Sequence, residues 1–221
     1  ISGPDYSFGF GVANFWRAVD MLENTRYAVG TISPGPAQTI SISVPAGTAQ
    51  LKVMLYWNDP PAAAVSSQTL INNLDLEVVT PAPATVLPLI LDTVPANIKN
   101  AAVNGVDNIN NIEQVVIDNP AAGSYTIRII PTNIAVNPSQ EYFIAYDFIP
   151  VETKLITPIG GEAYLQGENM MARWDSYGDP VNPFTLEYSI DNGSNWILLN
   201  NNITSDRRQY FYTAPDPNEW F

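Results

Sequence analysis

Histidine and cysteine are both absent from the sequence. A chain without an imidazole or a thiol cannot form a Ser-His-Asp triad, a Cys-His pair, an iron–sulfur centre or a zinc site with the usual ligands. Charged residues are scarce, at 14% of the chain, and no apolar run approaches the length of a membrane span. The commonest catalytic chemistry is therefore excluded for this chain by itself, and we expect no membrane span.

Basic residues are also few: Lys and Arg number 9 against 22 Asp and Glu, which gives a net charge of −13. This charge repels phosphate backbones and anionic lipid surfaces, so nucleic acid is not an expected partner. Turn-forming residues are abundant instead, with 22 Asn, 19 Pro and 13 Gly. The acidic, lysine-poor composition fits a secreted or cell-surface protein, and 221 residues are enough for one large or two modest domains.

One helix and eight strands are predicted before residue 150. Only residues 12–23 have apolar side chains at spacings of three and four, with Phe15, Val19 and Leu22 on one face. From residue 25 onward the period changes to two, which predicts strands near 27–32, 38–44, 50–57, 73–79, 86–91, 113–118, 124–130 and 141–149. Strands without intervening helices, separated by Pro, Gly and Asn turns, predict a two-sheet sandwich of the jelly-roll type and exclude a doubly wound α/β fold.

A boundary is predicted at residues 149–153, because a new series of short strands begins there. We expect an all-β chain with one N-terminal α-helix, in which residues 25–150 form a jelly-roll β-sandwich and residues 151–221 form an immunoglobulin-like β-sandwich. Only about six strands fit into the second region, so we expect that module to be incomplete. Residues 92–112 are an Asn-rich connection, and connections of that length tend to be functional or mobile.

The segment before the helix carries a recognisable pattern. Tyr6, Gly9, Gly11 and Asn14 fit Y-x-x-G-x-G-x-x-N. This pattern resembles the end of the catalytic domain in subtilisin-like serine proteases, where such a turn and helix follow the helix that bears the nucleophilic serine. Residues 53–61, 70–76, 110–115 and 123–127 then follow in the order found in the β domain of alkaline subtilases with a C-terminal jelly roll, which is related to the P-domain of proprotein convertases.

The resemblance covers residues 3–149, so residues 1–24 are expected to be the last part of a subtilase catalytic domain. It implies a non-catalytic role for this chain, because the Asp, His and Ser of the family would all lie upstream of residue 1. Residue 1 is not followed by a signal-peptide pattern either, and we expect a piece of a longer, secreted bacterial protein. The expected partners are its own upstream catalytic domain, which the jelly roll would stabilise, and the protein substrates of the protease. We expect the protein to be a monomer.

Oxygen-bearing side chains gather at strand ends and in the long connection, and they predict a calcium site. Calcium prefers six to eight oxygen ligands, and no His or Cys is present to compete. The resemblance points the same way, since the related subtilases are known for calcium sites. The alternative is that these side chains only cap turns through their own backbone. The ligands that we select are Asp59, Asn73, Asp75, Asn111 and Glu113, with Asn72, Asp107, Asn108 and Asn110 nearby.

A second pattern lies in the last region, where Ser189, Asp191, Gly193 and Trp196 fit the S-x-D-x-G-x-x-W sequence of the Asp-box. It predicts a hairpin turn with Trp196 packed across it, in surroundings that look like immunoglobulin-like modules of secreted bacterial enzymes.

Two other functions stay open. One is a cell-surface adhesion or carbohydrate-binding protein made of two β-sandwiches, with exposed aromatic side chains as the sugar platform. The other is an enzyme that uses carboxylates alone, as glycosidases do, although no pair of carboxylates is placed in a way that demands it.

Overall fold

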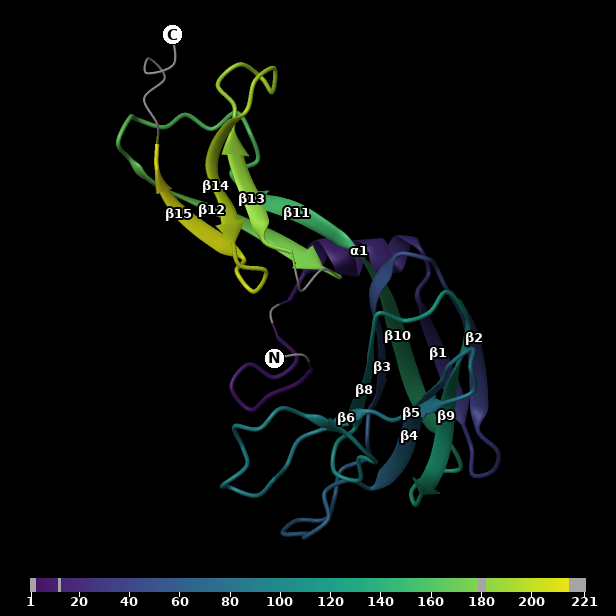
Figure 1. The fold of residues 1–221 in the computed structure, drawn as a ribbon. Helices are drawn as coiled ribbons and strands as arrows, with labels where there is room; N and C mark the ends of the chain where they lie inside the picture. Colours follow the sequence, from purple (N-terminus) through teal and green to yellow (C-terminus); the bar gives the residue numbers. More distant parts are fainter. Residues whose placement is uncertain (1–2, 12, 179–181, 215–221) are drawn as a thin grey trace. The chain divides into compact units, whose positions relative to one another are not determined.

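The computed structural model describes residues 3–11, 13–178 and 182–214, and the chain divides into two compact units. Unit 1 is Ile1–Ile149 and unit 2 is Pro150–Phe221. Antiparallel strands are the main secondary structure, and a single α-helix is found among the described residues, so the predicted all-β class is confirmed (Figure 1). No helix in the described part of the chain is long and apolar enough to cross a membrane.

Unit 1 is built from two four-stranded sheets, with the orders β1-β10-β3-β8 and β2-β9-β4-β5. β1 pairs with β10, β2 with β9, β3 with β8 and β4 with β5, so the chain is a long hairpin rolled into two layers. This nested pairing is the arrangement of a jelly roll, as predicted. The eight strands are β1 (Tyr27–Ile32), β2 (Gln38–Val44), β3 (Thr48–Trp57), β4 (Asn72–Val79), β5 (Thr85–Val86), β8 (Ile112–Asp118), β9 (Gly123–Ile134) and β10 (Gln140–Pro150).

The core of unit 1 lies between the sheets and follows the alternation of the sequence. Leu51, Val53, Leu55 and Trp57 of β3 have no exposed surface, whereas Tyr56 between them is 41% exposed. Each large apolar side chain buried in this way contributes about 1.5–3 kcal/mol. The other strands add Leu74, Leu76 and Val78 from β4, Val115 from β8, Ile127 and Ile129 from β9, and Tyr142 and Ile144 from β10.

The strand predicted over residues 86–91 is interrupted at Pro88, which has no backbone N–H to donate. Two short strands replace it, β5 and β6 (Leu89–Ile90). β6 pairs with β7 (Val103–Asn104), so Leu89 lies opposite Asn104 and Ile90 opposite Val103. The long connection between β6 and β8 is therefore fastened at its middle, and its last part leads into the start of β8.

The helix, α1 (Phe15–Glu23), is shorter than predicted. It begins at Asn14, whose Oδ1 accepts a hydrogen bond of 3.1 Å from the backbone N–H of Arg17. This N-cap contact satisfies one of the N–H groups that a helix start leaves unpaired. The predicted first residue, Val12, lies outside the described residues.

Unit 2 consists of two small antiparallel sheets, with the orders β11-β12-β15 and β13-β14. Its core contains Ala172, Trp174 and Ile203, against which Phe184 packs; the rings of Trp174 and Phe184 meet edge to face with centroids 5.3 Å apart. The strands are β11 (Glu152–Thr157), β12 (Asn169–Tyr177), β13 (Phe184–Tyr188), β14 (Ile197–Ile203) and β15 (Gln209–Thr213).

Candidate metal centre

The start of β4 is fixed by Asn72, whose side chain is fully buried and uses both ends of its amide. Its Oδ1 accepts hydrogen bonds from the backbone N–H groups of Ala135 and Val136, at 2.9 and 3.0 Å. Its Nδ2 donates to the Val136 carbonyl and to Oε1 of Gln140, at 2.9 and 2.8 Å. The indole N–H of Trp57 donates to the Asn72 carbonyl at 2.9 Å. This complete network holds β4 to the segment after β9.

The next side chains along β4 are not satisfied in this way. Oδ1 of Asn73, Oδ1 of Asp75 and Oε1 of Glu113 are all buried, and none has a hydrogen-bond partner among the described residues. Asn73 and Asp75 lie two positions apart on β4, whereas Glu113 belongs to β8 of the other sheet. Most buried polar atoms in proteins are paired, and each unpaired one costs about 1–3 kcal/mol. Three such oxygens therefore need a physical explanation.

Glu113 and Asn73 each use their second polar atom in a hydrogen bond that ties β4 to a neighbouring segment. Oε2 of Glu113 accepts a hydrogen bond of 2.7 Å from the backbone N–H of Leu76, the residue that follows Asp75. Nδ2 of Asn73 donates to Oδ1 of Asn108 at 2.9 Å, which ties β4 to the end of the long connection. Since β5 pairs with β4 only at the far end of the strand, the side chain of Glu113 takes the place of a strand partner at Leu76.

The turn before β8 is organised around Asp107, which is 7% exposed. Its Oδ1 accepts hydrogen bonds from the backbone N–H groups of Ile109 and Asn110, at 2.8 and 3.0 Å, and its Oδ2 accepts from Nδ2 of Asn110 at 2.7 Å. Short local hydrogen bonds of this kind are typical of Asp in turns. They hold a third carboxylate close to Asp75 and Glu113, which both feel its charge.

Nearby negative charges disfavour the ionisation of Asp75 and Glu113. Burial, together with the negative charges of Asp75 and Asp107, raises the pKa of Glu113 to about 8, against the hydrogen bond from Leu76. Burial also raises the pKa of Asp75, as does the charge of Asp107, although a hydrogen bond from the Thr132 hydroxyl lowers it. A site whose carboxylates repel one another in this way is stabilised by a bound cation.

The donor set fits calcium. No three His, Cys, Asp or Glu side chains form a metal cluster in the described part of the chain. The unpaired oxygens, however, come from two carboxylates and one amide, Asp75, Glu113 and Asn73, and calcium accepts carboxylate, amide and backbone oxygens alike. Hard oxygen donors without nitrogen or sulfur disfavour zinc, copper and iron. These residues would hold the ion, and its charge would neutralise the carboxylates of Asp75 and Glu113.

The other two predicted ligands make different contacts. Oδ2 and Oδ1 of Asp59 accept hydrogen bonds from the backbone N–H groups of Ile71 and Asn72, at 2.8 and 2.7 Å. Nδ2 of Asn111 donates to the Trp57 carbonyl at 2.8 Å. Both side chains therefore bind backbone groups that are distant in the sequence, rather than the local backbone of a turn. Of the five predicted ligands, Asn73, Asp75 and Glu113 each keep a buried oxygen without a partner among the described residues, and the charge of Asp107 acts on both Asp75 and Glu113.

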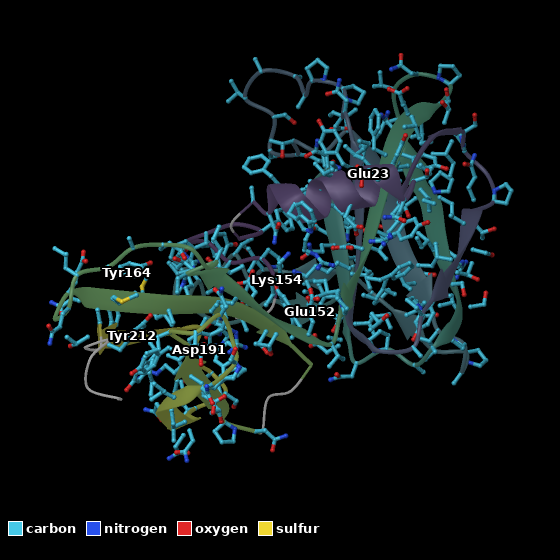
Figure 2. The ribbon with its side chains drawn as sticks, turned by 90° about the horizontal axis from the view of Figure 1, so that it is seen from above. Glu23, Glu152, Lys154, Tyr164, Asp191 and Tyr212 are labelled. Atoms are coloured by element: carbon cyan, nitrogen blue, oxygen red, sulfur yellow. The ribbon has the colours of Figure 1, made fainter. Side chains whose placement is uncertain are left out.

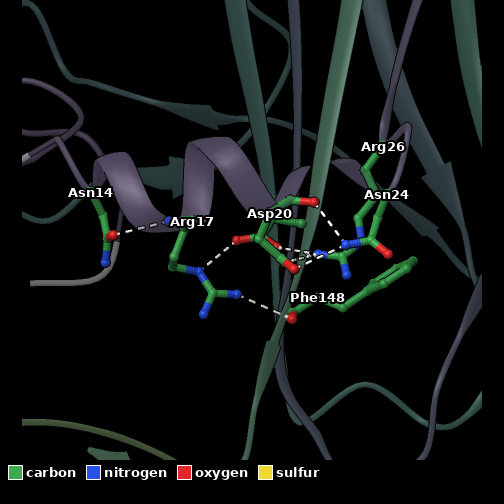
Figure 3. A network of polar contacts seen from close by, with 7 residues as sticks. Asn14, Arg17, Asp20, Asn24, Arg26 and Phe148 are labelled. Carbon is green, nitrogen blue, oxygen red and sulfur yellow. Dashed lines mark hydrogen bonds and ion pairs between the residues drawn. The ribbon is translucent and has the colours of Figure 1, made fainter. Parts of the chain in front are cut away.

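A separate network binds α1 to β10 through the polar face of the helix (Figure 3). Nε of Arg17 lies 2.7 Å from Oδ2 of Asp147, and a second guanidinium nitrogen donates to the Phe148 carbonyl at 3.1 Å. Arg26 contacts the other oxygen of Asp147 at 3.0 Å and Asp20 of the helix at 2.8 Å. The guanidinium of Arg26 also lies over the Phe148 ring, 5.4 Å from its centroid. Sequence reasoning missed this network.

The apolar face of α1 points away from the jelly roll. No residue of the helix is buried, and Phe15, Val19 and Leu22 are 80%, 50% and 57% exposed. An apolar helix face normally packs against another part of a protein, but among the described residues of unit 1 nothing covers this one. The helix is therefore docked by its charged side, which is the reverse of the usual arrangement for an amphipathic helix.

The Asp-box pattern of unit 2 forms the predicted turn between β13 and β14, where Figure 2 labels Asp191. Its carboxylate accepts hydrogen bonds from the backbone N–H of Asn195 at 2.8 Å, from Nδ2 of the same residue at 2.6 Å and from the Ser189 hydroxyl at 2.8 Å. These contacts lower the pKa of Asp191 to about 2. Gly193 has a φ of +83°, and a Cβ there would lie 3.5 Å from the ring of Trp196. The motif is thus a structural turn.

Comparison with known proteins gives one informative relative, and no protein-family model matches the chain. The chain is similar to the "Serine protease/ABC transporter B family protein tagA" of Dictyostelium discoideum, with 27% identity over 150 residues. The match covers 63% of this chain but only 8% of the length of that relative. The similarity connects this chain with a protein that is named as a serine protease, and it is too distant to assign a family.

Proposed function

We propose that unit 1 is an accessory β domain of a secreted subtilisin-like serine endopeptidase, and that its role is to stabilise the catalytic domain upstream in the same polypeptide and to help shape substrate access. The chain itself contributes no catalytic residue in this proposal. The similarity to a protein named as a serine protease supports the link with proteolysis. The subtilase assignment rests on the pattern Tyr6, Gly9, Gly11 and Asn14 and on the jelly roll that follows it.

The observation that carries the proposal is the orientation of α1. Its charged side is tied to β10 by Arg17 and Asp147, whereas Phe15, Val19 and Leu22 face away from the jelly roll. Exposed apolar side chains on one face mark a surface that another body covers. The occupant that fits is the catalytic domain, because the helix lies at the N-terminal end of the jelly roll and the subtilase resemblance makes it the last helix of that domain.

Calcium has a definite role in this proposal. The ion would bind Asn73, Asp75 and Glu113 at the end of the jelly roll and hold β4 of one sheet to β8 of the other. Since the ion binds the folded protein and has no equivalent site in the unfolded chain, it raises the free energy of unfolding. A calcium-rich environment outside the cell suits such a site, in line with a secreted or cell-surface location.

The test uses the whole parent polypeptide and a version that ends at Arg26, which keeps the helix and removes the jelly roll. We expect both to cleave a peptide substrate with similar kcat/KM at low temperature, because the catalytic groups lie upstream. The half-life of activity on heating should be much shorter for the truncated protein. Equal half-lives, or the absence of a serine protease sequence before residue 1, would contradict the proposal.

Point variants separate the docking surface from the general stability of the domain. Phe15→Asp with Leu22→Asp should shorten the half-life of activity on heating, because charges cannot be buried against a catalytic domain without a large penalty. Val65→Asp is the matched control: Val65 is fully exposed on the connection between β3 and β4. The control should behave as the wild type does.

A further inference from the structure

One strand of unit 2 has an open edge beside an apolar cavity. β13 pairs with β14 and with no other strand among the described residues, so one of its edges carries unpaired backbone groups. Unpaired edges are templates for pairing with another strand, and natural proteins usually cover or block them. Here the edge belongs to Phe184–Tyr188, whose side chains alternate between half-buried and exposed.

The cavity runs along this strand. It has a volume of about 180 Å³ and is lined by Leu155 of β11, Trp174 of β12, and Phe184, Thr185 and Leu186 of β13. Successive residues of a strand point to opposite faces, so a cavity that touches three in a row wraps around the edge of β13. A volume of this size suits one large apolar side chain, since an engineered cavity of roughly 150 Å³ binds benzene.

Trp174 of the cavity lining gives an independent observation, an indole N–H without an acceptor in the described part of the chain. Its side chain is 4% exposed, and its indole Nε1–H is buried without a hydrogen-bond acceptor among the described residues. Buried tryptophan N–H groups usually have a partner, and an unpaired one costs about 1–3 kcal/mol. The cavity thus offers an apolar space, a buried donor and a row of unpaired backbone groups together.

We infer that the edge of β13 receives an additional β-strand, which places an apolar side chain in the cavity and a backbone carbonyl within reach of the Trp174 indole N–H. An extended peptide is the ligand that meets all three needs, because it supplies backbone donors and acceptors along one side and side chains at alternate positions. A small apolar molecule would fill the space and leave the edge unpaired.

The source of the strand, in this proposal, is the same polypeptide beyond Phe221. The relative that matches this chain is far longer than the matched region, which is 8% of its length. A segment tethered to the chain meets its site at an effective concentration in the millimolar range, so even a weak edge pairing is filled within one molecule. The inference concerns unit 2 and does not depend on the proposed role of unit 1.

The experiment compares the 221-residue chain with one lengthened by the next roughly 40 residues that its gene encodes, enough for two strands and their connections. Both are labelled with ¹⁵N-tryptophan, and Trp174→Phe identifies the indole signal. In the lengthened chain we expect the Trp174 Nε1–H signal to move downfield and exchange more slowly, and amide exchange over residues 184–188 to slow on the order of tenfold or more. No protection, or a gene that ends at Phe221, would overturn the inference.

Two variants of the lengthened chain act as a matched pair. Leu155→Glu places a charge at the lip of the cavity, where Leu155 is 47% exposed, and should abolish the added protection. Leu198→Glu alters a leucine of β14 that is 50% exposed and lies off the cavity, and should retain the protection. The opposite result for either variant would contradict the placement of the strand.

Further measurements identify which polypeptide supplies the added strand. Protection that appears in the 221-residue chain alone and grows with protein concentration would mean that a second copy supplies the strand, which overturns the proposal. Should the lengthened chain aggregate, a synthetic peptide of the same 40 residues is added to the 221-residue chain. Protection by that peptide supports the inference, and its absence at saturating peptide counts against it.

Discussion

The carboxylate of Glu113 on β8 accepts a hydrogen bond of 2.7 Å from the backbone N–H of Leu76 on β4, and so bridges the two sheets of the jelly roll. One oxygen is used in this bridge, and the other is buried and unpaired. Without a cation, a charged carboxylate in this position lowers the stability of the folded protein, because burial and its acidic neighbours disfavour the charged form. In the calcium proposal, the charge of the ion would offset this cost.

The first prediction is that Glu113→Gln has opposite effects with and without calcium. In a chelator above pH 8, the variant should be at least as stable as the wild type, because the amide oxygen can keep the bond to Leu76 and no buried charge remains. In calcium at about 100 times its dissociation constant, the wild type should gain roughly 2.7 kcal/mol, or about 5–10 °C in Tm, and the variant little. Calorimetric melting measures both.

An unchanged wild-type Tm after verified removal of calcium would show that the ion does not bind at this place. Magnesium is the control ion, since it demands a smaller octahedral shell and keeps several waters. It should give a smaller shift than calcium at the same concentration.

The second prediction contrasts two adjacent asparagines. Asn72→Ala removes four side-chain hydrogen bonds and leaves the Ala135 and Val136 backbone unpaired, so it should cost about 2–4 kcal/mol whether or not calcium is present. Asn73→Ala removes one hydrogen bond, to Asn108, and an oxygen that has no partner. It should weaken calcium binding and change the stability of the metal-free protein by less than about 1 kcal/mol.

Urea unfolding and calcium titration by calorimetry measure the two quantities separately. Equal losses of stability for both variants in a chelator would mean that Asn73 is a structural residue and that its unpaired oxygen is not a ligand.

The strands of unit 1 could be predicted because their alternation is strong. In β3, every second residue from Leu51 to Trp57 is fully buried, and a shift of one position would expose them all. The prediction of one continuous strand over residues 86–91 was wrong, because it followed the apolar residues and gave too little weight to Pro88. Local periodicity thus predicts most strands of unit 1 well, but a single proline, which lacks a backbone N–H, can still divide a predicted strand into two.

The orientation of α1 could not be predicted, because periodicity reveals that a helix has two faces and not which of them meets the protein. Arg17 and Asp147 are 130 positions apart, and nothing in the sequence pairs them. For the same reason, the sequence could not show which of the candidate calcium ligands keep an oxygen free of other partners. Asp59 and Asp75 offer identical chemistry, but two backbone N–H groups occupy Asp59, and one Oδ of Asp75 is left unpaired.

The third prediction concerns the attachment of the helix. Arg17→Ala removes the contacts to Asp147 and to the Phe148 carbonyl, in a pair whose side chains are 19% and 18% exposed. We expect a loss of about 1–2 kcal/mol and faster amide exchange over residues 15–23, because the helix loses its anchor. Arg26→Ala should not add independently, since both arginines bind Asp147.

Arg128→Ala is the control for Arg17→Ala. Arg128 pairs with Glu77 within the other sheet and is 39% exposed, so its removal should cost less than about 1 kcal/mol and leave exchange in the helix unchanged. Unaltered exchange over residues 15–23 in Arg17→Ala would show that the network is not what holds α1.

The fourth prediction is a pH dependence that belongs to unit 2. The pKa of Asp191 is lowered from 3.8 to about 2 by hydrogen bonds from Asn195 and Ser189 to its carboxylate. A lowered folded-state pKa means that the stabilisation is fully present above pH 3.8 and is lost as the pH falls through about 2. The turn should therefore loosen as the pH falls from 3.8 to about 2. The fluorescence of Trp196, which lies beside the turn and is 61% exposed, measures this change. Asp191→Asn should abolish the pH dependence of this signal. A transition of unchanged midpoint and size in that variant would assign the effect to other carboxylates.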